Sequence, residues 1–291
     1  MLLWAFSFPL LIWGLGIVKP FTLAMLRYVI LIIPLVLYMH FSCGLKSAVR
    51  ALKDDYVIFI LIALTSVALP NLTQNLGMSM NNESSVSSIL QSSGPIYMVI
   101  LAVIFLKERM GTLQYFGLVL GLAGSVLLAT NGLSMLSGGT FTGNMLIMCS
   151  AVSYAVASVM GKNALKRHNP MIVISWTTII GAAMLVPPVF AEPLAFPSAN
   201  GWILIIALSV TSSFLAYILW YTVMAYTDVS KLATTVYLIP VMTIGLSYWL
   251  LNERLSMEAI VFSAMIIAGV VAASIDYKPK TPKTKKEKGK G

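Results

Sequence analysis

Two segments decide how this chain is built: Ser88–Arg109 (SILQSSGPIYMVILAVIFLKER) and Ala233–Arg254 (ATTVYLIPVMTIGLSYWLLNER). When the second is laid over the first, Pro95 falls on Pro240, and the Glu-Arg pair that ends each segment also coincides, at a spacing of 145 residues. A proline and a Glu-Arg dipeptide that recur at one spacing indicate an internal duplication.

The composition surrounding these segments is that of a membrane protein. Of 291 residues, 58% are hydrophobic and only 10% are charged, whereas soluble domains carry about 25% charged residues. The apolar residues form blocks of roughly 20, the length that a helix needs to cross a bilayer. We therefore predict an all-α integral membrane protein with ten transmembrane helices, which lie at about 2–18, 22–42, 56–78, 84–106, 112–130, 144–163, 171–191, 201–225, 231–251 and 257–275.

The basic residues indicate how these helices are oriented. With both termini in the cytoplasm, the inner connections and the tail hold 16 of the 19 Lys and Arg residues, and the outer connections hold only Lys19 and Arg254. Such a bias towards the cytoplasm predicts a cell-membrane protein with this orientation. The segment 276–291, which contains seven lysines, is predicted to be a disordered polybasic cytoplasmic tail that contacts anionic lipid headgroups. We do not expect a nucleic-acid partner, because a basic run directly after a span is explained by this topology.

The duplication has a consequence for function. The predicted repeats, residues 1–130 and 144–275, contain five helices each, so the second copy enters the membrane inverted relative to the first. Inverted repeats are typical of secondary transporters, whose halves alternate around a site between them. The sequence therefore predicts a permease rather than an enzyme.

The chain resembles the EamA family of the drug/metabolite transporter superfamily. The resemblance is carried by ten spans in two halves, a Pro…Leu-x-Glu-Arg ending in each half, and Trp4 early in the first span. It implies a polytopic permease or exporter of amino acids, other metabolites or drugs, with a central cavity between the halves.

Polar residues in two predicted spans form the first half of the candidate site. Asn71, Gln74 and Asn75 are spaced to share one face of the third span. Gln91 and Ser92 lie at a similar depth in the fourth span. Because polar groups at membrane depth are costly unless they pair or face water, we predict that these side chains bind substrate in a cavity. The alternative is hydrogen bonding that only joins the helices.

Aromatic residues occupy the corresponding positions of the second repeat. Asn75 aligns with Trp220, the next residue with Tyr221, and Ser92 with Tyr237, while Tyr217 lies nearby. Aromatic rings bind apolar or planar solutes, and their polar tips supply directed hydrogen bonds. These residues are therefore predicted to bind substrate on the inner side of the pathway, unless they are interfacial anchors.

Three further residues have two interpretations each. Pro95 and Pro240, placed in mid-helix, are predicted hinges, because each removes a backbone hydrogen bond; the alternative is an ordinary packing kink. Arg27 is the only charge inside a predicted span away from its ends. It either binds a substrate carboxylate or extends to the outer interface, and its place near the outer end of the second span favours the interface.

The remaining polar residues carry no catalytic pattern. No acid lies deep in any predicted span, and Cys43, Cys149, His40 and His168 are isolated, so we expect no metal and no cofactor. The predicted function is transport, in the direction of export, of a small metabolite such as an amino acid or a similar neutral or zwitterionic solute. The alternatives are a drug or nucleotide-sugar carrier on the same fold, an intramembrane enzyme, and a lipid scrambling protein. A fused repeat favours a functional monomer and leaves a dimer open.

Overall fold

The computed structural model is helical, and no strand occurs in the part of the chain that it describes. The predicted tail and Tyr237 lie outside the described residues, so the structure does not test either of them. The described residues are 1–81, 83–106, 111–129, 139–193, 196–227, 229, 232, 236 and 238–275.

The described residues of the first half of the chain form eight α-helices and one π-helical segment, η1. They are α1 (Leu2–Leu15), α2 (Pro20–Val29), α3 (Ile32–Ser42), α4 (Leu45–Ala63), η1 (Leu64–Ala68), α5 (Leu69–Asn81), α6 (Ser84–Gln91), α7 (Gly94–Leu106) and α8 (Thr112–Ala129).

The second half has a similar set of elements, with one π-helical segment, η2. They are α9 (Gly139–Ala164), α10 (Pro170–Val189), α11 (Ala199–Leu208), η2 (Ser209–Leu215), α12 (Ala216–Tyr226), α14 (Leu238–Leu251) and α15 (Met257–Ser274).

Six helical stretches in the described residues are long and apolar enough to cross a membrane. Four shorter apolar helices accompany them, and all ten overlap the predicted spans. The number of membrane crossings stays a prediction, because these four are shorter than the roughly 20 residues that a full crossing takes. The six long stretches are Pro20–Ser42, Leu45–Asn81, Ser84–Phe105, Phe141–Ala164, Pro170–Val189 and Ala199–Tyr226.

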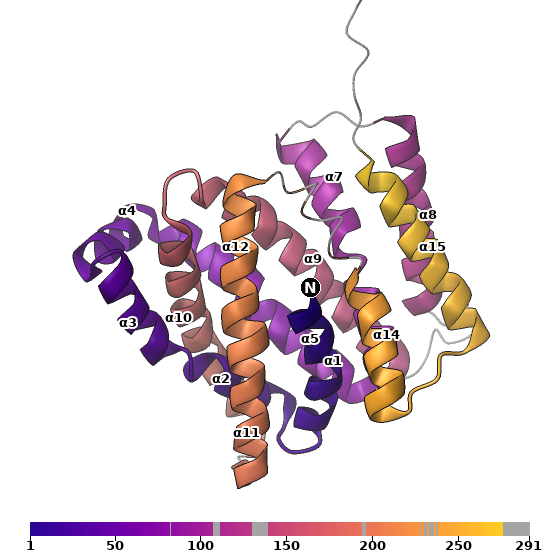
Figure 1. The fold of residues 1–291 in the computed structure, drawn as a ribbon, viewed down its shortest axis with the longest axis horizontal. Helices are drawn as coiled ribbons and strands as arrows, with labels where there is room; N and C mark the ends of the chain where they lie inside the picture. Colours follow the sequence, from indigo (N-terminus) through magenta and orange to yellow (C-terminus); the bar gives the residue numbers. More distant parts are fainter. Residues whose placement is uncertain are drawn as a thin grey trace, which may run out of the picture.

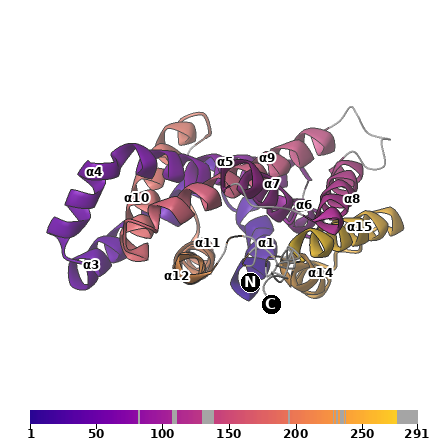
Figure 2. The same cartoon turned by 90° about the horizontal axis from the view of Figure 1, so that it is seen from above.

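The helices form an elongated bundle with three clusters of buried apolar side chains. In Figures 1 and 2, α3 and α4 lie at one end, α8 and α15 at the other, and α1, α5 and α9 between them. The α8–α15 pair is joined by glycines: a side chain at Gly269 would collide with the backbone of Gly121. Such close approach is the usual reason for small residues between membrane helices. The N-terminus lies near the centre of the bundle (Figure 1).

Local sequence signals explain where several helices begin. Pro20 and Pro170 occupy the first turns of α2 and α10, where a missing N–H costs nothing. The side chain of Asn169 accepts a hydrogen bond from the Met171 N–H at 2.9 Å, which caps α10.

The connection between the second and third predicted spans, at 43–55, is mostly helical. Gly44, with φ 75°, turns the chain, and α4 begins at Leu45 and continues to a non-helical residue at Asp55 before entering the apolar part. Ala48 and Ala51 of this first section are buried, whereas Lys46 is exposed. The segment is therefore an amphipathic helix, whose polar face suits the edge of a membrane.

Candidate functional site

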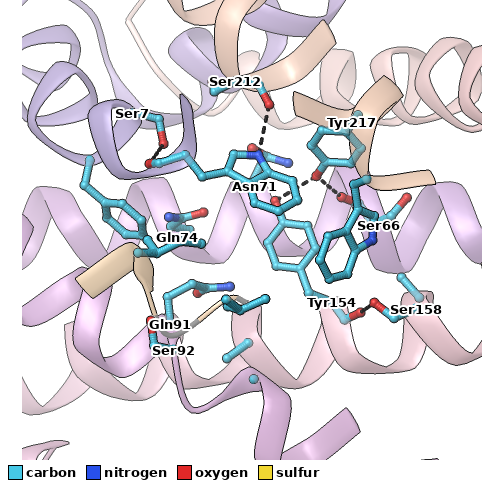
Figure 3. A pocket seen from close by; sticks show the side chains of 18 of the residues that line it. Ser7, Ser66, Asn71, Gln74, Gln91, Ser92, Tyr154, Ser158, Ser212 and Tyr217 are labelled. Atoms are coloured by element: carbon cyan, nitrogen blue, oxygen red, sulfur yellow. Dashed lines mark hydrogen bonds between the residues drawn. The ribbon is translucent and has the colours of Figure 1, made fainter. Parts of the chain in front are cut away.

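A cavity of about 110 Å³ lies in the middle of the bundle, and helices from both halves line it. Residues of α1, α2, η1, α5, α6 and α7 face residues of α9, η2, α12 and α14 across it. Gln74 and Gln91 lie at one end of the view in Figure 3, and Tyr217 and Ser66 lie at the other. The cavity thus combines an amide-rich end with an aromatic end.

The side chain of Arg27, in α2, lines this cavity. The side chain is buried, with 4% of its surface exposed, and Nη2 donates to the hydroxyls of Ser212 at 3.1 Å and Ser213 at 3.0 Å. Its guanidinium carbon lies 5.7 Å from the ring centroid of Tyr28. The predicted extension of Arg27 to the outer interface is therefore wrong: the two hydroxyls of η2 hold it inside the protein.

Aromatic rings form a wall that joins the first and last parts of the chain. Trp4 lies 5.9 Å from Tyr217 and 5.3 Å from Trp220, measured between ring centroids, and its indole N–H donates to the Ser212 carbonyl at 3.1 Å. Tyr217 stacks on Tyr221 at 6.4 Å. The rings offer an apolar surface that is fixed in place by hydrogen bonds.

A chain of hydroxyl groups ties this wall to η1. The Tyr217 hydroxyl lies 3.1 Å from the Ser66 carbonyl and 3.1 Å from the Tyr154 hydroxyl. Because a carbonyl only accepts, Tyr217 donates to Ser66 and accepts from Tyr154. Asn71, in turn, donates to the Tyr28 hydroxyl at 3.0 Å and to the Val67 carbonyl at 2.7 Å.

Three buried polar atoms around the cavity have no hydrogen-bond partner. They are Nε of Arg27, Oγ of Ser66 and Oε1 of Gln91. Buried polar groups are nearly always paired, so each such atom requires an explanation. All three belong to residues that line the same cavity.

The structure brings most of the predicted site residues together. Asn75 does not line the cavity; its amide donates to the Pro20 carbonyl at 3.1 Å and joins α5 to α2. Tyr237 lies outside the described residues. The predicted residues that line the cavity are Arg27, Asn71, Gln74, Gln91, Ser92, Tyr217, Trp220, Tyr221 and Pro95.

The two prolines lie near helix starts, so the mid-helix placement is wrong. Pro95 is the second residue of α7, after a break at Ser92 and Ser93 that separates α6 from α7. Pro240 is the third residue of α14 and is buried, but it does not line the cavity. A proline at a helix start replaces an N–H that would have no partner there, and a hinge role for either proline stays a prediction.

Several residues that line the cavity were missed by sequence reasoning. Tyr28 and Tyr154 sit in helices read only as apolar spans, and Ser66 and Ser212 were not distinguished from other small polar residues. Trp4 was noticed for the resemblance alone. The 145-residue spacing does not single out these serines, because Ser66 falls on Thr211, although η1 and η2 begin 145 residues apart, at Leu64 and Ser209.

The π-helical segments explain some of these contacts. A π turn is wider than an α turn and leaves backbone carbonyls for other partners, and such turns occur often at functional sites. In η1 the carbonyl of Thr65 accepts from the Ser153 hydroxyl at 2.9 Å and that of Ser66 accepts from Tyr217. In η2 the carbonyl of Ser212 accepts from Trp4.

Two carboxylates fix the starts of helices that lead to the cavity. Glu192 accepts from the Phe21 and Thr22 N–H groups, each at 3.0 Å, at the start of α2. Glu253 accepts from the Ser84 and Ser85 N–H groups at 2.8 and 2.9 Å and from both hydroxyls, at the start of α6. Negative charge at a helix N-terminus is favourable, since it meets unpaired N–H groups.

An ion pair lies where α4 meets the α9–α10 connection. Asp55 contacts Nε2 of His168 at 2.7 Å and Nη1 of Arg167 at 3.3 Å. The predicted topology assigns these residues to the same side, and it assigns Glu192 and Glu253 to the other side together with their partners. The contacts agree with this division, although they leave open which side is cytoplasmic.

Long apolar helices packed around a polar and aromatic cavity define a multi-pass membrane protein with a compartment for a small solute. The EamA-like transporter family matches residues 1–130 and, a second time, residues 141–275. The chain therefore belongs to the EamA-like transporter family.

Similar proteins agree with this assignment. An uncharacterized transporter of Archaeoglobus fulgidus is 26% identical over 93% of each chain, and the uncharacterized transporter YoaV of Bacillus subtilis is 22% identical over 92% of each chain. A WAT1-related chloroplastic protein of Arabidopsis thaliana is 25% identical over 64% of this chain and 47% of its own. A solved crystal structure with 19% identity superposes with a TM-score of 0.65 over 93% of this chain and 96% of its own, which shows the fold.

Proposed function

We propose that this chain is a secondary transporter that moves a small metabolite across the cell membrane by alternating access. The proposed substrate is an amino acid or a similar neutral or zwitterionic solute, and the proposed direction is export. Ten spans form two inverted halves, residues 1–130 and 144–275, and both termini lie in the cytoplasm.

The observation that carries this proposal is the cavity between the halves. Its walls come from helices of both family-matched regions, and three of its buried polar atoms have no protein partner. A compartment that both halves close is what alternating access needs, because a movement of one half against the other opens it to either side. η1 and η2 begin 145 residues apart, which is the spacing of the duplication, and this supports the inverted repeat.

The size of the cavity favours a small solute. Its volume of about 110 Å³ is well below the roughly 300–1,000 Å³ of sites that hold drug-sized molecules. A nucleotide sugar or a large drug therefore requires the bundle to expand. For this reason we place small metabolites ahead of those two classes.

Transport into proteoliposomes of known orientation tests the proposal. Wild type is compared with Gln91→Ala and Trp220→Ala on a panel of amino acids and other metabolites, and Lys19→Gln serves as a control on the exposed outer end of α2. We expect flux of at least one solute and about a tenfold loss with each cavity variant, since tenfold corresponds to about 1.4 kcal/mol. Gln91→Ala would lose a hydrogen bond to the ligand of about that size, and Trp220→Ala would lose an aromatic contact of about that size. Flux equal to that of empty liposomes for every solute would refute the proposal.

A further inference from the structure

Arg27 is the only charged side chain among the described residues that line the cavity. Its neighbours are neutral: the hydroxyls of Ser212 and Ser213 accept from Nη2, and the ring of Tyr28 lies beside the guanidinium. The described ion pairs all lie elsewhere, at Asp54 and Asp55, and none includes Arg27. The cavity therefore holds one positive charge without a counter-charge.

Such an arrangement is costly for stability alone. A buried charge at membrane depth is tolerated when it is paired or serves function, and hydroxyl groups neutralise none of its charge. An uncharged side chain would suffice for packing. A guanidinium cannot become neutral by losing its proton, so the charge stays in the cavity. A feature that costs free energy in the empty protein is explained if the missing charge arrives with a ligand.

The free part of the guanidinium has a definite geometry. Nη2 is held by the two serines, whereas Nε is buried without a partner. Guanidinium N–H groups form a planar fork that matches the two oxygens of a carboxylate. The serines thus fix the orientation of the fork and leave one of its donors for a ligand.

The other walls suit the rest of such a ligand. The unpaired Oε1 of Gln91 and Oγ of Ser66 offer hydrogen bonds, and Trp4 and Trp220 offer ring surfaces to an apolar group. One cation matches a single negative charge, so a carboxylate balances it better than a phosphate ester, which carries more than one charge at neutral pH.

We propose that Arg27 is the substrate-recognition residue of this cavity and that the transported solute carries a carboxylate, which pairs with the guanidinium. The inference deepens the proposed transport function and rests on it. It also identifies the end of the solute that faces α2 and η2, and leaves the apolar part of the solute to the aromatic wall. Amino acids and simple monocarboxylates share this chemistry.

Matched solutes test the inference on the wild-type protein. L-leucine is compared with L-leucinamide, which lacks the negative charge, and with 4-methylpentanoate, which lacks the amine; the same sets are made for alanine and phenylalanine. Binding is measured as a thermal shift of the detergent-solubilised full chain, and transport as flux into proteoliposomes. We expect each carboxylate to bind at least tenfold more tightly than its amide. A response from 4-methylpentanoate would extend the class from amino acids to monocarboxylates.

Variants then assign the effect to Arg27. Arg27→Gln is expected to abolish the preference for carboxylates, Arg27→Lys to retain part of it, and Lys19→Gln, which removes a nearby exposed charge from the same helix, to retain all of it. If Arg27→Gln does not fold, the wild-type comparison still decides. Amides that bind and move as well as carboxylates would overturn the inference and leave the transport proposal standing. Absence of flux for every compound would refute the transport proposal, and the inference with it.

Discussion

At the scale of single residues, the polar groups of the bundle divide by whether the protein itself satisfies them. The Asn71 amide nitrogen and the Tyr217 hydroxyl make their hydrogen bonds within the protein, so these groups hold the walls of the cavity in place. Ser66 and Gln91 each keep a buried oxygen without a partner. Asn75 also has an unpaired oxygen, but its amide joins two helices outside the cavity.

Asn75 and Gln91 should therefore respond differently to substitution. Asn75→Ala removes the hydrogen bond that joins α5 to the Pro20 carbonyl, so we expect it to destabilise the fold by about 0.5–1.5 kcal/mol and to change KM less than twofold. Gln91→Ala is expected to raise KM severalfold with little change in Tm. Thermal unfolding and concentration-dependent flux measure both variants, and a larger KM effect from Asn75→Ala would contradict the placement of Asn75 outside the site.

At the scale of elements, two carboxylates bind the first residues of helices that belong to interrupted spans. Glu253, in the connection after α14, binds the first two residues of α6, and Glu192, after α10, binds the start of α2. Each contact joins parts of the chain that are about 170 residues apart in sequence. Because the second and fourth spans are interrupted, at Ile30–Leu31 and Ser92–Ser93, such contacts set the position of their outer pieces.

Glu253→Gln should weaken this joint. The amide nitrogen of glutamine cannot accept a hydrogen bond, so the variant loses the bonds to one serine together with the charge at the helix start. We expect a loss of about 2–4 kcal/mol in unfolding free energy, because hydrogen bonds to charged groups contribute about 1.5–3 kcal/mol each. Thermal unfolding in detergent measures it.

Glu258→Gln is the matched control for this prediction. Glu258 lies in the first turn of α15 and its side chain is exposed, so the substitution removes the same charge from the same end of the bundle without breaking the joint. Equal Tm values for the two variants would show that the Glu253 contacts do not hold α6.

At the scale of the whole molecule, the contacts on the two predicted membrane sides of the bundle agree with one topology. Asp55 contacts His168 on one side, and Glu192 and Glu253 contact the starts of α2 and α6 on the other side. The excess of Lys and Arg around Asp55 predicts that its side is cytoplasmic. The orientation is open to a direct measurement.

Single cysteines measure it, in a background in which Cys43 and Cys149 are replaced by serine. Asn200→Cys and Lys46→Cys place a thiol at exposed positions on the two sides. We expect a membrane-impermeant maleimide to label position 200 in intact cells and position 46 only after permeabilisation. The opposite pattern would invert the proposed topology.

The sequence was most informative where periodicity and charge act over many residues. The ten apolar segments and the repeat marked by Pro95 could be predicted, because hydrophobic length and spacing depend on no tertiary contact. Of the amides predicted to share one face of the third span, Asn71 and Gln74 line the cavity, whereas Asn75 does not and binds α2. Arg27 was misjudged, because the hydroxyls that hold it, on Ser212 and Ser213, lie 185 and 186 residues away.

The π turns were not predicted for a similar reason. The sequence around Ser209 contains no glycine or proline, and Pro70, which follows η1, does not distinguish a π turn from a kink. The turns are stabilised by side chains from other helices, such as Tyr217 and Trp4, which bind the released carbonyls. Features that depend on such distant partners become visible only when the chain is folded.

The contact between Trp4 and Trp220 makes the cavity observable by light. Their ring centroids are 5.3 Å apart, so a solute that enters between the halves changes the surroundings of both indoles at once. Four other tryptophans would mask this emission, and replacing them with phenylalanine would leave a pair of intrinsic fluorophores inside the compartment. Filling and emptying of the cavity would then be followed in real time without any attached dye. The tryptophans to be replaced are Trp13, Trp176, Trp202 and Trp249.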